Sequence, residues 1–152
     1  MPVREGLERL DGVEFISPRP DLRTATCELR LKNGRLLDPE RMSKFLFDIR
    51  VGARLRGLEA TANGRLEKQQ GGFVLRIAGT EECLRLAPLE RKVQLDAARK
   101  EPMPASRSER KACQRLLARW RGKPFSVRVT GPLVKRHGGV LTLEVRRFGK
   151  IN

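Results

Sequence analysis

The stretch SRSERKACQRLLARWRGKP, residues 106–124, decides the fold of the second half of the chain. Ser106 and Glu109 have the spacing of a capping box, in which each side chain accepts a hydrogen bond from the other residue's backbone N–H at the start of a helix. Gly122 and Pro124 are residues that typically end a helix. The stretch therefore predicts one helix, and the segments on either side show what it belongs to.

Alternation of apolar and polar residues predicts three strands before this helix and two after it. The expected strands are one that begins near residue 53 and then 73–78, 83–87, 125–129 and 140–148. Three strands, a helix and two strands are the order of the OB-fold, a small five-stranded barrel; an SH3-like barrel is the nearest competitor. We therefore expect a small OB-like β-barrel domain with one helix over 55–152. The charged, proline-bearing segment 88–105 is expected to be a linker or excursion with a helical turn over 89–99.

The first half of the chain is expected to be a smaller domain of mixed helices and strands. Residues 4–11 predict a short helix, Val13 to Ile16 predict a strand, and 23–32 predict a half-buried strand. Pro39 opens an amphipathic helix, whose apolar face comprises Met42, Phe45, Leu46 and Ile49. With one more strand in front, this order is the βαββαβ arrangement. The expected fold class is α+β: a truncated ferredoxin-like βαββαβ domain over 1–54, followed by the barrel.

Two segments of this first half carry a family resemblance. They are LERLDGVEFIS (7–17) and LRTATCELRLKNGRLLDPERMSKFLFDI (22–49), and they resemble a heavy-metal-associated, copper-chaperone-like domain. The resemblance implies metal-related docking or metal ion binding without catalysis. The family's Cys-x-x-Cys loop, whose two thiolates suit Cu(I), would lie before residue 4. We therefore expect either that the natural protein is longer or that the domain has lost its metal and kept its surface.

The missing first strand has a structural consequence. A sheet that lacks one strand leaves unpaired N–H and C=O groups at an edge, and such an edge pairs readily with another chain. We therefore expect either a homodimer through this edge or a poorly stable N-terminal half.

The sequence predicts no catalytic site, no metal site and no cofactor. Cys27, Cys83 and Cys113 lie far apart, and His137, the only histidine, lies in a predicted hairpin loop. Three scattered cysteines do not predict a disulfide framework, and they favour a reducing, cytoplasmic setting. No apolar run approaches the roughly 20 residues that span a membrane. We expect a cytoplasmic binding protein that is not an enzyme and has no membrane contact.

The charge of the chain suggests a second function, in a different class from metal-related docking. The formal net charge is +15, and residues 105–152 hold thirteen Lys and Arg residues against two Glu. Such a field attracts nucleic acid or an acidic protein, although a solvated basic surface without function is the plain alternative. The predicted polyanion-binding residues are Arg107, Lys111, Arg115, Arg119, Arg128, Lys135, Arg136, Arg146, Arg147 and Phe148.

Spacing and aromatic content suggest how such binding would work. Arg107, Lys111, Arg115 and Arg119 recur every four residues and form a positive stripe, while the other cations lie on the closing strands and their hairpin. Phe148 is the best candidate for an exposed aromatic ring on which a base could stack. The alternative function is therefore non-specific binding of single-stranded nucleic acid, with a strong salt dependence.

Overall fold

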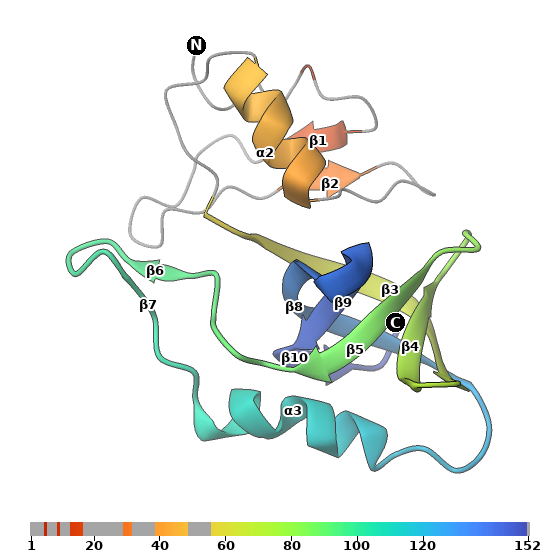
Figure 1. Ribbon diagram of the computed structural model, residues 1–152. Helices are drawn as coiled ribbons and strands as arrows, with labels where there is room; N and C mark the ends of the chain where they lie inside the picture. Colours follow the sequence, from red (N-terminus) through yellow and green to blue (C-terminus); the bar gives the residue numbers. More distant parts are fainter. Residues whose placement is uncertain are drawn as a thin grey trace. The chain divides into compact units, whose positions relative to one another are not determined.

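The computed structural model describes residues 5, 9, 13–16, 29–31, 39–48 and 56–151. The chain divides into two compact units (Figure 1). One unit comprises residues 1–56 with 94–103, and the other comprises residues 57–93 with 104–152. None of the helices in the described ranges combines the length and the apolar character that a membrane span requires.

In the first unit, the described elements are two short strand pairs and a helix. They are β1 (Val13–Ile16), β2 (Leu29–Leu31), α2 (Pro39–Asp48), β6 (Leu95–Asp96) and β7 (Glu101–Pro102). Strand β1 pairs antiparallel with β2, and both strands lie within segments that the sequence predicts to be strands. Met42 is 1% exposed, in agreement with the predicted apolar face of its helix. The residues that would complete a ferredoxin-like sheet, and Cys27, lie outside the described residues, so that arrangement stays a prediction.

The predicted helical turn over 89–99 is wrong. Strands β6 and β7 form a short antiparallel hairpin at 94–103 instead. Asp96 sets the turn, because its Oδ1 accepts hydrogen bonds from the N–H groups of Ala98 (3.0 Å) and Arg99 (3.3 Å). An aspartate that bonds the backbone two residues on is a typical turn former. The turn closes where the N–H of Lys100 donates to the carbonyl of Asp96 over 2.8 Å.

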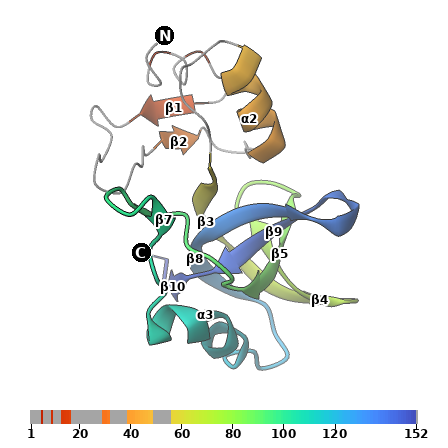
Figure 2. The same ribbon diagram turned by 60° about the vertical axis from the view of Figure 1, so that its left-hand side comes forward.

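The second unit is a closed five-stranded β-barrel (Figures 1 and 2). Its strands are β3 (Leu58–Gln69), β4 (Gly72–Ile77), β5 (Cys83–Pro88), β8 (Phe125–Arg136) and β9 (Val140–Val145). The order around the barrel is β3-β4-β5-β9-β8, and β8 pairs back onto β3. The β5–β9 pair is parallel and the other neighbours are antiparallel. The small β-barrel expected from the sequence is therefore confirmed.

One helix and one short strand complete this unit. Helix α3 (Arg107–Leu117) lies between β5 and β8 in the chain, where the sequence predicts the helix of the barrel. It packs beside β5, β9 and β10 (Arg147–Gly149), a strand that adds to the edge of β8. A short helical turn, η1 (His137–Gly139), joins β8 to β9.

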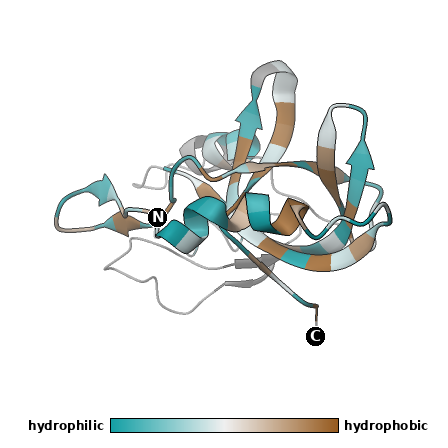
Figure 3. Ribbon diagram, turned by 90° about the horizontal axis from the view of Figure 1, so that it is seen from below, coloured by the Kyte–Doolittle hydropathy of each residue, from teal (hydrophilic) through white to brown (hydrophobic). Residues whose placement is uncertain are grey.

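The core of this unit fills the barrel and continues under α3. Apolar residues alternate with hydrophilic ones along the strands (Figure 3), which is the pattern of strands with one buried face. The barrel residues that are at most 2% exposed are Leu66, Leu75, Leu84, Val127, Val129, Leu143 and Val145. Helix α3 adds Ala112, Cys113 and Leu116 to the buried set.

The start of α3 is as predicted and its end is not. Ser106 Oγ accepts from the N–H of Glu109 (3.1 Å), and Glu109 Oε2 accepts from the N–H of Ser106 (2.8 Å), so the capping box is confirmed. The helix ends at Leu117 rather than at Gly122. The N–H groups of Arg119 and Trp120 donate to carbonyls three residues back, which tightens the last turn. The Trp120 ring then meets Phe73 edge-on, at 5.6 Å between ring centroids.

Candidate nucleic-acid interface

The ten predicted binding residues lie in several separate groups. Four of them lie along α3 and just beyond its end, and two others, Lys135 and Arg136, lie at the far end of β8. Arg128 lies on the same strand, eight residues before Arg136, which is up to about 27 Å along an extended chain. Arg146 lies between β9 and β10, and its neighbour Arg147 is the first residue of β10. The structure therefore does not gather them into one patch, and the groups differ in whether carboxylates neutralise them.

The largest uncompensated group is the row on α3. We call the exposed side chains of Arg107, Lys111, Arg115 and Arg119 the α3 surface. Each step of four residues advances about 6 Å along a helix axis, so the first three form a regular row of cations. Among the described residues, no carboxylate pairs with any member of this row; Arg115 donates only to Ser108 Oγ, at 3.4 Å. The row therefore faces solvent with its charge unneutralised.

The one acidic residue of α3 is neutralised from the other side of the helix. Glu109 Oε1 lies 3.1 Å from Arg146 Nη1 and 3.1 Å from Lys92 Nζ. Arg146 also pairs with both oxygens of Glu59, at 2.7 Å from Nε and 2.6 Å from Nη2. The Arg146 side chain is only 12% exposed, so a phosphate would have to displace two carboxylates to reach it. Arg146 is therefore a structural residue that holds α3 to the barrel.

The protonation of these groups follows from the same contacts. Burial acts to raise the pKa of Glu109, but the Ser106 N–H, Lys92 and Arg146 together lower it to about 2. Hydrogen bonding to Glu59 raises the pKa of Arg146. Both groups are thus charged at neutral pH, and the carboxylate of Glu109 cancels positive charge inside the unit rather than on the α3 surface.

Glu109→Gln is expected to destabilise the second unit by about 1–3 kcal/mol at neutral pH. The amide keeps the shape of the side chain but loses the charge-assisted bonds to Lys92 and Arg146. Because the pKa of Glu109 is lowered by folding, its stabilising effect is complete above about pH 4.5 and is lost as pH falls towards about 2. The difference in unfolding free energy between wild type and variant should therefore shrink as the pH falls through that range. Urea unfolding followed by the fluorescence of Trp120, the only tryptophan, measures it.

The control for this substitution is Glu81→Gln. The side chain of Glu81 is fully exposed and meets Arg76 at 3.4 Å. Exposed ion pairs of this kind contribute little to stability, so the free energy of unfolding should change by less than about 0.5 kcal/mol. Equal unfolding midpoints for Glu109→Gln and wild type at neutral pH would contradict the role given to Glu109.

The cations of β8 also have partners. Arg136 Nη2 lies 3.3 Å from Glu90 and 3.3 Å from Glu144, whose side chain is 5% exposed. Glu144 is held in place by the N–H of Glu90, which donates to it over 2.9 Å. Arg128 Nε donates to Asn63 Oδ1 at 2.8 Å. These residues are less available to a polyanion than the α3 surface.

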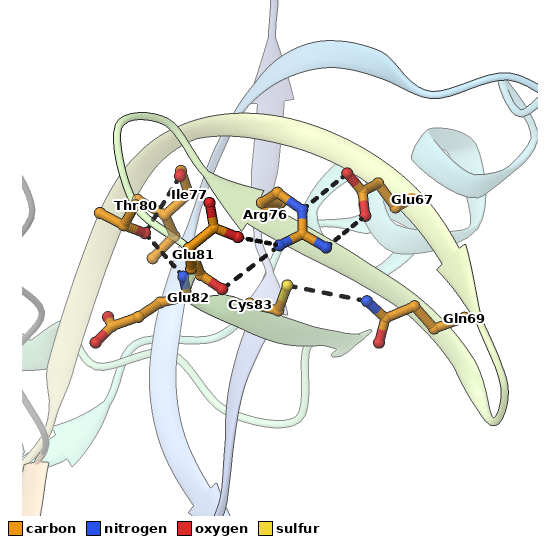
Figure 4. Close-up of polar contacts among 8 residues, drawn as sticks. All are labelled: Glu67, Gln69, Arg76, Ile77, Thr80, Glu81, Glu82 and Cys83. Carbon is orange, nitrogen blue, oxygen red and sulfur yellow. Dashed lines mark hydrogen bonds and ion pairs between the residues drawn. The ribbon is translucent and has the colours of Figure 1, made fainter.

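On the outer face of β3, β4 and β5, Arg76 lies among carboxylates (Figure 4), whereas Arg65 and Arg85 have no carboxylate partner among the described residues. Arg76 contacts both oxygens of Glu67, at 3.0 and 3.1 Å, and Glu81 at 3.4 Å. The hydrogen bond from Arg76 holds the pKa of Glu67 below its ordinary value. Gln69, at the end of β3, donates to the sulfur of Cys83 at the start of β5, over 3.9 Å. An anionic ligand would meet carboxylates as well as cations on this face.

Arg119 and Phe148 are the two predicted residues that lie in direct contact across elements. The Cζ atom of Arg119 lies 4.8 Å from the centroid of the Phe148 ring, which is a cation–π contact. Phe148 is half-buried in β10, where it pairs with Val129 of β8. Successive strand residues point to opposite faces, so Arg147 points away from this contact.

Sequence reasoning did not find the network around Arg146, nor the contact between Arg119 and Phe148. The sequence identified Glu109 as part of a capping box, but it did not predict that Glu109 pairs with Arg146. The Arg146 network and the Arg119–Phe148 contact both join residues that are far apart in the chain. They form only when the barrel closes, so local sequence patterns do not predict them. A buried glutamate such as Glu144 carries no local signal either.

The metal hypothesis concerns residues 1–54, most of which lie outside the described residues. In the described part of the chain, no three His, Cys, Asp or Glu side chains are grouped so as to hold a metal ion. Cys113 is buried, and burial raises the pKa of its thiol. The metal-related docking inferred for residues 1–54 stays a prediction. Comparisons of the chain with protein-family models, with curated proteins and with solved structures gave no match.

Proposed function

We propose that the unit formed by residues 57–93 and 104–152 binds nucleic acid, without sequence preference, through phosphate contacts to the α3 surface. One observation carries the proposal: four exposed cations follow one another along α3 and have no carboxylate partner among the described residues. The only acidic side chain of the helix, Glu109, is occupied by Lys92 and Arg146.

The strand order supports an OB-like assignment of this barrel. The order β3-β4-β5-β9-β8, with a parallel β5–β9 pair and α3 between β5 and β8, fits a five-stranded barrel of that kind. OB-folds bind oligonucleotides or oligosaccharides at the face of their second and third strands. Here Arg76 of β4 is paired with Glu67 of β3 and with Glu81 of the β4–β5 turn, so an anion on this face would meet carboxylates, and we place the ligand on the α3 surface instead. A fold hosts many functions, and the charge arrangement is what favours nucleic acid.

A nucleic-acid strand suits the α3 surface because both are linear and regularly charged. The cations of Arg107, Lys111 and Arg115 follow at steps of about 6 Å along one helix face. A polyphosphate backbone offers anions in a row, and each contact releases condensed counterions. Arginine also forms paired hydrogen bonds to phosphate oxygens.

Binding of a fluorescent single-stranded oligonucleotide is therefore expected at about 50 mM salt, where even non-specific phosphate contacts are measurable. Four contacts at the α3 surface predict a slope of log affinity against log salt of about −3, since each contact on a single strand contributes about −0.7. Fluorescence anisotropy over a salt series measures both quantities.

Two results would refute the proposal. One is no binding of the oligonucleotide at about 50 mM salt. The other is tighter binding of polyglutamate than of an oligonucleotide with the same number of charges, which would assign the α3 surface to an acidic protein.

A further inference from the structure

The contact between Arg119 and Phe148 lies at the C-terminal end of the α3 surface. Arg119 is the fourth cation of the row and the first one beyond the helix. Its side chain is exposed, whereas the ring beneath it is half-buried. The guanidinium group thus lies over an aromatic ring while the residue remains open to solvent.

Both partners are held in place before any ligand arrives. The N–H of Arg119 donates to the carbonyl of Leu116 over 3.0 Å, and the ring of the next residue, Trp120, packs on Phe73 in a T-shaped arrangement. Phe148 is fixed by the pairing of β10 with β8. Groups that are ordered in advance lose less conformational entropy on binding.

Other aromatic residues near α3 are less suited to contact a ligand. The Phe73 ring already contacts the Trp120 ring in a T-shaped arrangement and the ammonium group of Lys68, at 5.7 Å from its centroid. Among the described residues, no carboxylate pairs with Arg119. Nucleobases stack on aromatic rings and on the planes of arginine side chains.

We propose that the Arg119–Phe148 pair is a stacking position for one unpaired base of a single-stranded nucleic acid whose phosphates follow the α3 surface. The base would lie on the guanidinium group, which is backed by the Phe148 ring. This inference rests on the proposed function, and it adds the partner class: single strands rather than duplexes. A duplex keeps its bases stacked on one another and offers only its phosphates. Preference among the four bases is weak, because every base has a π-face.

The test compares three probes of equal length: oligothymidylate, an abasic single strand and a duplex. The abasic strand has the same phosphates and no bases. Wild-type protein is expected to bind oligothymidylate about five-fold or more tightly than the abasic strand, which is the lower range for one stacked base. Anisotropy at about 50 mM salt gives the three affinities.

Arg119→Lys separates stacking from charge. Lysine keeps the positive charge but has neither the planar group nor the paired donors of arginine, so the salt slope should change little, and any loss of affinity for the abasic strand measures the phosphate contact alone. The affinity for oligothymidylate should fall to nearly that for the abasic strand. The matched control is Arg110→Lys, which makes the same chemical change at an exposed arginine of α3 that is not part of the α3 surface, and it should leave the base preference intact.

Phe148→Leu tests the ring itself. Leucine preserves apolar packing in β10, so thermal unfolding should be close to that of wild type, while the base preference should fall about two-fold or more because the ring that backs Arg119 is gone. Because Phe148→Leu leaves Arg119 in place, it tests the stacking position independently of any backbone change that Arg119→Lys causes.

The possible results distinguish this inference from the proposed function. Equal binding of oligothymidylate and the abasic strand by wild type, or a base preference that survives Arg119→Lys, would overturn the stacking position and leave phosphate binding intact. A duplex bound as tightly as oligothymidylate would overturn the single-strand assignment. Failure of all three probes to bind would overturn both proposals.

Discussion

Reversal of three charges on the α3 surface, by Arg107→Glu, Lys111→Glu and Arg115→Glu together, is expected to weaken single-strand binding about 100-fold or more at about 50 mM salt. The change removes three of the four proposed phosphate contacts and places three carboxylates beside the strand. The salt slope should become shallower by about 2, because each contact contributes about 0.7. A salt series by anisotropy measures the affinity and the slope in one experiment.

The matched control reverses three exposed cations that are not on α3. They are Lys44 on α2, Arg56, which precedes β3, and Arg65 on β3. This variant loses the same net charge, so a purely global effect of the +15 charge would weaken binding equally in both triple variants. Similar affinities for the two variants would show that the α3 surface is not the binding site.

The triple reversal on α3 is also expected to leave the helix intact. Arg107 lies at the start of α3, where a glutamate interacts favourably with the positive end of the helix dipole. Arg115 lies in the last turn, where a glutamate interacts unfavourably with the negative end. The two effects oppose each other. The buried face of the helix, with Ala112 and Leu116, is untouched. Circular dichroism of the variant should therefore match that of wild type.

Local signals in the sequence predicted most of the second unit. The capping box at Ser106 and Glu109 located the start of α3, and apolar alternation placed the five barrel strands, because both patterns operate over a few residues. Two bounds were wrong: β8 continues to Arg136, and the strand expected at 140–148 is divided into β9 and β10. The end of α3 was missed, since Gly122 is a strong local signal for a helix end. In the structure, the helix ends at Leu117, five residues before Gly122, and Trp120 between them packs on Phe73.

The candidate site could be predicted only in part, for a physical reason. Every Lys and Arg looks alike in a sequence, but closure of the barrel brings Arg146 to Glu59, which lies 87 residues earlier in the chain. That pairing divides the basic residues into those that hold the fold together and those that face solvent. The periodic row at Arg107, Lys111 and Arg115 needs only helix geometry, so the sequence identified it. The contact of Arg119 with Phe148 needs the placement of β10.

The approach of β8 to the end of β9 makes a further strong prediction. A Cβ atom on Gly131 would overlap the carbonyl oxygen of Glu144, and it would lie 2.8 Å from the carbonyl carbon of Glu144 and 3.0 Å from the nitrogen of Arg146. The N–H of Arg146 donates to the carbonyl of Thr130 over 2.9 Å, so this backbone crossing is fixed by a hydrogen bond. Neither backbone segment can yield without disturbing the barrel closure and the ion pairs of Arg146.

Gly131→Ala is therefore expected to destabilise the second unit by about 3 kcal/mol or more, at or above the upper end of the usual range for overpacking. Urea unfolding followed by Trp120 fluorescence measures the loss. The matched control is Gly149→Ala in β10, where an added Cβ would meet no atom within 4 Å. That variant should unfold within about 0.5 kcal/mol of wild type. If the two alanine variants were equally stable, β8 could not approach Glu144 as closely as the barrel requires, and the placement of Arg146 between Glu59 and Glu109 would be wrong as well.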